Sequence, residues 1–124
     1  MKIYFIIILL AMPVPGRADL FENDPIDARE ICKQYNFDTQ LNEMVECLEK
    51  VTQKYPNSPR SYYFLAVAYI YADDKKSTKT QYQNLLDKDD RAALALLFAI
   101  GSIKPEWVDD YYIKESKRLN KKYE

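Results

Sequence analysis

Residues 58–71 read SPRSYYFLAVAYIY, and this stretch decides the fold. A serine followed by a proline is typical of a helix start, because the hydroxyl caps the first turn and proline has no N–H to leave unpaired. The side chains that follow keep the three- and four-residue spacing of a helix. The stretch therefore predicts a helix over residues 59–71.

The pattern of this stretch recurs 34 residues earlier in the chain. Four of its positions, which are Tyr62, Leu65, Ala66 and Tyr69, have counterparts at Ala28, Ile31, Cys32 and Tyr35. A second apolar run after each set keeps the same step, with Thr78, Tyr82 and Leu85 matching Met44, Leu48 and Val51. A period of this length indicates stacked helical hairpins, each unable to bury its apolar face without a neighbour. The chain is therefore predicted to be all-α, in line with only two glycines and a charged fraction of 30%.

The recurring positions resemble the tetratricopeptide (TPR) repeat. With Pro56 as the proline that ends one unit, the next unit begins at Pro59, and Tyr62, Leu65, Ala66 and Tyr69 fall on the first-helix positions of that family. The resemblance covers roughly residues 25–120, and the slightly longer Sel-like repeats are a close alternative. The sequence departs from the pattern at Met44, Leu48, Thr78 and Asp90, and a third unit keeps only Leu96, Ala99 and Ile103. The resemblance implies a short right-handed superhelix of about three antiparallel hairpins.

Capping residues and prolines predict where the helices begin and end. First helices are expected over about residues 25–35 and 59–71, with Asp24 and Ser58 as the caps before Pro25 and Pro59. Second helices are expected from Asp38 or Thr39 to about 54 and from Ser77 to about 86. A fifth helix is expected from Asp89 to a C-terminal cap at Gly101, and a sixth from Pro105 onward.

Residues 1–18 have the layout of a secretory signal peptide. Lys2 precedes an apolar run from Ile3 to Met12, and Ala18 marks the expected cut. The run is too short for a stable membrane span, although a retained anchor is the alternative. The domain then covers residues 19–124. Removing Lys2 and Arg17 leaves 16 basic and 19 acidic residues, and this near-neutral charge argues against a nucleic-acid partner.

The two cysteines lie symmetrically about the predicted turn of the first hairpin. Cys32 and Cys47 are equidistant from position 39.5, and residues equidistant from the turn of an antiparallel hairpin face one another. In an exported chain with only these two cysteines, a disulfide is the favoured interpretation. Two free thiols or a redox pair are the alternatives.

The composition argues against catalysis, a metal site or a cofactor. There is no histidine, which removes the commonest general base. The acidic clusters Asp73-Asp74, Asp87-Lys88-Asp89-Asp90 and Asp109-Asp110 fall where loops or helix starts are expected, and acidic side chains there suit the helix dipole. The sequence therefore predicts no enzyme, although an enzyme of an unfamiliar type stays an alternative.

A second face of the helix at residues 59–71 is the candidate binding site. In the TPR family, first-helix faces line a concave groove that binds peptides or partner segments, and tyrosine and arginine are residue types that contribute strongly to interfaces. The positions on this face are Arg60, Tyr63, Val67 and Ile70. The matching positions are Arg29 and Lys33 in the first unit and Leu97 in the third. The alternative is that Tyr63, Val67 and Ile70 lie covered beneath the sixth helix.

We therefore expect an exported protein-interaction module, in a bacterial periplasm or secreted, that binds a protein or peptide segment in this groove. The expected segment is apolar and carries acidic residues, because the groove is apolar at its centre and cationic toward one end. The alternative is a small disulfide-stapled secreted inhibitor or accessory protein that uses an edge or loop of the bundle.

Overall fold

The computed structural model describes residues 20–124, so the predicted signal peptide and its cleavage site lie outside the described residues. Within this range the chain forms six α-helices, one short 3₁₀-helix and no strand, which confirms the all-α prediction. None of these helices is long and apolar enough to cross a membrane. The elements are α2 (Ala28–Ile31), α3 (Leu41–Lys54), α4 (Pro59–Tyr71), α5 (Lys75–Lys88), α6 (Asp90–Ile103), η2 (Pro105–Trp107) and α7 (Asp110–Lys122).

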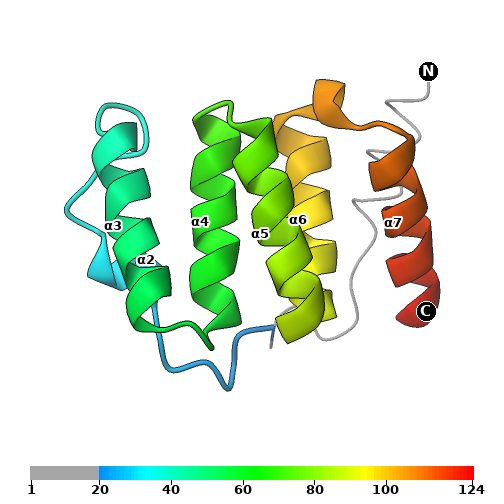
Figure 1. Ribbon diagram of the computed structural model, residues 1–124, viewed down its shortest axis with the longest axis horizontal. Helices are drawn as coiled ribbons and strands as arrows, with labels where there is room; N and C mark the ends of the chain where they lie inside the picture. The colour runs from blue at the N-terminus through cyan, green and yellow to red at the C-terminus, as the bar shows by residue number, and fades with distance from the viewer. Residues whose placement is uncertain (1–19) are drawn as a thin grey trace.

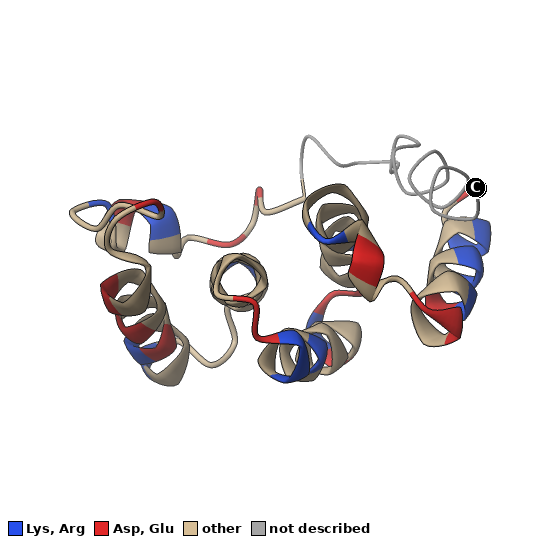
Figure 2. Cartoon of the chain, turned by 90° about the horizontal axis from the view of Figure 1, so that it is seen from above, with Lys and Arg blue, Asp and Glu red and all other residues tan. Residues whose placement is uncertain are grey.

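The helices lie side by side in a row, with α3 at one end and α7 at the other (Figure 1). α4 packs against α3, α5 and α6, and α7 packs against α6. Seen from above, α2 and α6 lie toward one side of α4, and the chain before α2 runs across that side (Figure 2). This path brings residues 20–27 next to the predicted binding face of α4.

Two hydrophobic clusters form the core, and α4 contributes to both. Leu65 and Ala68 join the cluster built on α2 and α3, whereas Ala66 and Ile70 join the larger cluster built on α5, α6 and α7. The predicted repeat positions are buried in both units for the pairs Cys32 and Ala66, Met44 and Thr78, Leu48 and Tyr82, and Val51 and Leu85. Ile31 is an exception: its counterpart Leu65 is buried, whereas Ile31 itself is 45% exposed.

The predicted disulfide is present between Cys32 and Cys47, whose Cα atoms are 6.0 Å apart. It joins the residue that ends α2 to the middle of α3. Because α2 has only four residues, it is far too short to be stable as an isolated helix. The disulfide therefore fixes the first hairpin where its own helix contributes little.

Several predicted helix ends are wrong, and each has a local cause. The first helix spans four residues, not the predicted 25–35, because Asp27 and not Asp24 caps it. α5 begins at Lys75 because Asp74 caps it, and the Ser77 N–H donates to the Asp74 carboxylate. α6 continues through the buried Gly101 and ends at Ile103. It stops there because Pro105 disfavours the α conformation for the residue before it, Lys104. Pro105 begins η2, and the sixth helix begins at Asp110, where Asp109 caps it.

Candidate protein-binding face

The candidate site is built on the N-terminal end of α4. Ser58 caps the helix: its hydroxyl oxygen accepts hydrogen bonds from the backbone N–H of Ser61, at 3.2 Å, and from the Ser61 hydroxyl, at 2.8 Å. Pro59 occupies the first helical position, so the first N–H of the helix that needs a partner belongs to Arg60. That N–H points out of the helix toward the chain before α2.

Asp24 supplies the partner that this helix end needs. Its carboxylate accepts from the Ser58 hydroxyl at 2.8 Å and from the Arg60 N–H at 2.9 Å. The same carboxylate accepts from the N–H of Ile26 at 3.0 Å, which fixes the backbone of its own segment. Asp24 was predicted to cap the first helix, but it completes the end of α4 instead.

Phe21 lies on the aromatic surface of α4. The centre of its ring is 5.5 Å from that of Tyr63 and 6.3 Å from that of Phe64, both in tilted arrangements. Tyr63 and Phe64 also meet edge to face, with ring centres 5.4 Å apart. Such aromatic contacts contribute beyond the area that they bury. Residues 21 and 24 therefore hold the N-terminal segment against α4 at two points.

The predicted cations surround this surface, but acidic neighbours pair with two of them. Arg60 forms an ion pair with Asp27 at 3.2 Å. Lys33 pairs with Glu30 at 2.6 Å, and the pKa of Lys33 is raised mainly by the hydrogen bond to this carboxylate and also by its charge. The Arg29 guanidinium lies 5.6 Å from the centre of the Phe64 ring, in a cation–π contact. The cationic end of the predicted groove is thus partly neutralised within the molecule.

The apolar part of the predicted face divides into accessible and inaccessible residues. Tyr63 and Val67 are half-buried, whereas Ile70 is fully buried and Leu97 is 1% exposed. Ile70 and Leu97 belong to the core shared by α4 and α6, because these two helices pack directly together. The expectation that Ile70 and Leu97 lie at an accessible surface is therefore wrong.

Tyr63 is covered by Phe21 of the N-terminal segment, which the sequence analysis did not predict. The sixth helix was the predicted alternative cover, but α7 packs on α6, and its Tyr111 and Tyr112 rings meet Tyr82 of α5. Phe21 lies on Tyr63 instead. One signal was present in the sequence: Asp24 and Ser58 are 34 residues apart, which is the spacing at which the sequence pattern recurs.

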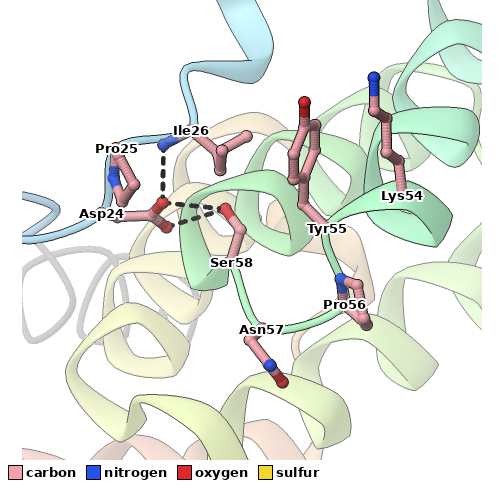
Figure 3. A pocket seen from close by; sticks show the side chains of 8 residues that line it. All are labelled: Asp24, Pro25, Ile26, Lys54, Tyr55, Pro56, Asn57 and Ser58. Atoms are coloured by element: carbon pink, nitrogen blue, oxygen red, sulfur yellow. Dashed lines mark hydrogen bonds between the residues drawn. The ribbon is translucent and has the colours of Figure 1, made fainter.

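A second accessible surface lies at the edge of the first hairpin. A cavity of about 330 Å³ opens between residues 24–26 and the turn at residues 55–58 (Figure 3). A neighbouring cavity of about 360 Å³ is lined by Ile31, Cys47, Lys50, Val51, Lys54 and Tyr55. Lys54 and Tyr55 line both cavities, and the Lys54 ammonium lies 5.4 Å from the centre of the Tyr55 ring.

One residue of each acidic cluster in the sequence caps the start of a helix. Asp74, Asp89 and Asp109 cap α5, α6 and α7, and each accepts a hydrogen bond from a backbone N–H of the first turn. In the part of the chain that the structure describes, no three acidic or cysteine side chains are grouped closely enough to hold a metal ion. The helix-start interpretation therefore accounts for Asp74, Asp89 and Asp109.

Comparison of the chain with models of known families, with curated proteins and with solved structures finds no match.

Proposed function

We propose that this chain is an exported protein-interaction module without a catalytic role, and that it binds an extended segment of a partner protein across the face formed by α2 and α4. The observation that carries the proposal is the cluster of half-buried aromatic residues Phe21, Tyr63 and Phe64, with the Arg29 guanidinium over Phe64. Tyrosine and arginine are among the residue types enriched at the positions that dominate the free energy of protein association.

The TPR-like repeat and the export of the chain belong to this proposal. The 34-residue spacing and the pairwise burial of equivalent positions support the repeat. The layout of residues 1–18 and the disulfide support an oxidising compartment, a bacterial periplasm or the exterior of the cell.

A second candidate places the partner at the edge of the first hairpin. Ile31 is 45% exposed, and the two cavities beside it share Lys54 and Tyr55. An edge of this kind suits the small disulfide-stapled inhibitor or accessory protein, in which the face of α4 has no direct role.

Matched alanine variants distinguish the two surfaces. The wild-type chain is used to capture its partner from the exporting cell, and the affinity for the captured protein is then measured. If the face of α4 is the site, Tyr63→Ala should weaken binding by about 2 kcal/mol or more, as expected for a central aromatic anchor. Arg29→Ala should change mainly the salt dependence of the association rate.

Ile31→Ala is the matched control on the other surface. Loss of binding with Ile31→Ala but not with Tyr63→Ala would reject the α4 face and support the edge. Unchanged binding with both variants would reject both candidate sites.

A further inference from the structure

Residues 20–24 have the contacts of a bound peptide, although they belong to the same chain. The Phe21 ring rests on Tyr63 and Phe64, and three residues later the Asp24 carboxylate accepts hydrogen bonds from Ser58 and Arg60. A hydrogen bond from the N–H of Asp24 to the carbonyl of Phe21, at 3.1 Å, fixes the spacing between these two anchors.

We infer that residues 20–24 are an internal ligand of the α4 face, and that the partner segment displaces them with the same chemistry: an aromatic side chain followed, three residues later, by a carboxylate. This inference rests on the proposed function of the face, and it specifies what the face recognises.

The requirement for a carboxylate follows from the end of α4. A helix N-terminus carries a partial positive charge, and its unpaired N–H groups favour an anionic acceptor. Here the acceptor receives the Arg60 N–H at 2.9 Å and the Ser58 hydroxyl at 2.8 Å, and both donors come from α4 and its cap. A carboxylate of a partner segment can accept the same two hydrogen bonds, so exchange leaves no donor of α4 unpaired.

The segment is also loosely packed, which favours its exchange. Asp24 and Pro25 line the cavity of about 330 Å³ on the side of Tyr55. They also line a cavity of about 230 Å³ to which Asp89 and Arg91, at the start of α6, contribute as well. Glu22 and Asn23, between the two anchors, are exposed. The segment is thus held at Phe21 and Asp24, with one cavity along it and a second beside Asp24.

The experiment measures whether the face accepts the same segment from solution. The receptor is the full chain with the substitutions Phe21→Ala and Asp24→Ala, which vacate the face, and the probe is a capped, fluorophore-labelled peptide of residues 20–26. A tethered segment has an effective concentration on the order of millimolar. The wild-type chain should therefore bind the peptide at least tenfold more weakly than the vacated chain.

Two controls separate recognition from nonspecific contact. Peptides with Phe21→Ala or with Asp24→Asn should each bind the vacated chain at least tenfold more weakly than the unchanged peptide. A receptor with Glu22→Ala and Asn23→Ala changes the same segment without removing either anchor, so it should bind the peptide as weakly as the wild type does. Circular dichroism of each receptor checks its helical content.

Equal peptide affinity of the vacated and wild-type chains would overturn the inference and leave Asp24 as a structural cap of α4. If the vacated chain does not fold, the single variant Phe21→Ala replaces it, with the same comparison and the same overturning result. Partner capture that depends on Tyr63, combined with no peptide binding, would retain the proposed function and reject the internal ligand. Peptide binding without capture that depends on Tyr63 would reject the proposed function alone.

Discussion

Asp73 has a backbone conformation that ordinarily requires glycine. Its φ of 60° is the only positive φ of a non-glycine residue in the range 20–124. The N–H of Asp73 donates to the carbonyl of Ile70 and the N–H of Asp74 to that of Tyr69, which together form the Schellman motif that ends a helix. In this motif the left-handed residue is usually glycine, because a Cβ atom crowds the backbone there.

Asp73→Gly should therefore stabilise the turn relative to Asp73→Ala. Both substitutions remove the ion pair with Lys104, at 3.4 Å, so the comparison isolates the backbone. The left-handed conformation costs a non-glycine residue about 1–2 kcal/mol, and we expect a difference of that size between the two variants in urea denaturation. Equal stabilities would mean that the turn takes another conformation in solution.

Single residues explain which parts of the site the sequence predicts. Cys32 and Cys47 are predictable because the symmetry of a hairpin turn constrains both of them. The role of Asp24 is not predictable, because a capping residue before proline is expected to act on the helix that follows it directly. Its carboxylate instead accepts a hydrogen bond from a helix that starts 35 residues later. Ile70 and Leu97 share the helical spacing of the accessible residues, and spacing alone does not say how closely α4 and α6 pack.

Two carboxylates, Asp90 and Glu115, connect α7 to the helices before it. Its Lys122 and Tyr123 side chains both donate hydrogen bonds to Asp90 at the start of α6. Glu115 accepts from the buried Tyr82 hydroxyl of α5 at 2.8 Å and from Arg118 at 2.9 Å. These carboxylates connect the last helix to both of its neighbours.

Both carboxylates have pKa values below their ordinary ones. Burial would raise the pKa of Asp90, but the hydrogen bonds from Lys122 and Tyr123 and the nearby positive charges lower it below 3.8. The hydrogen bond from Arg118 is the main cause that lowers the pKa of Glu115 below 4.5, and burial opposes it. A depressed pKa means that the ionised form stabilises the folded state. This contribution is complete above the ordinary carboxyl pKa and is lost as the pH falls through the lowered value.

Asp90→Asn should therefore flatten the acid side of the stability profile. We expect the wild-type melting temperature to fall more steeply than that of the variant as the pH drops below the ordinary carboxyl pKa, because the variant has no carboxylate to protonate at this position. Asp87→Asn, at an exposed position near the end of α5, is the matched control and should follow the wild type. Parallel acid limbs for wild type and Asp90→Asn would show that these contacts do not hold α7.

A cap followed by a proline predicted the start of α4 correctly, but the same pattern failed for the first helix. α4 begins at Pro59 and ends at Tyr71, as predicted, because Ser58 caps it and Pro59 fits the first position. Asp24 and Pro25 have the same pattern, but tertiary hydrogen bonds use the Asp24 carboxylate, so the helix begins later. The sixth helix begins five residues after Pro105 because the chain first makes the turn η2.

The molecule as a whole has two hydrophobic clusters that meet at α4. The larger cluster includes α6, Trp107 and α7, and the smaller one joins α2 and α3 to the opposite side of α4. The smaller cluster contains the disulfide, so the stability of the α2–α3 end depends on a covalent bond, whereas that of the α6–α7 end does not.

Reduction of the disulfide should therefore separate the unfolding of the two ends. Closing a loop with a sequence separation of 15 contributes about 3 kcal/mol in the chain-entropy model, and this contribution acts on α2 and α3. Trp107, the only tryptophan and 7% exposed, reports on the α6–α7 end by its fluorescence, and hydrogen exchange of Leu48 and Val51 reports on α3.

In the oxidised protein, we expect both reporters to follow one transition in urea, as in a two-state domain. After reduction, the amides of α3 should lose protection at a lower urea concentration than the one at which Trp107 fluorescence changes, because only the first hairpin loses a constraint. The double variant Cys32→Ser and Cys47→Ser should behave as the reduced protein does without any reductant. Coincident transitions after reduction would mean instead that α4 couples the two clusters so tightly that the loss of the disulfide is distributed over the whole molecule.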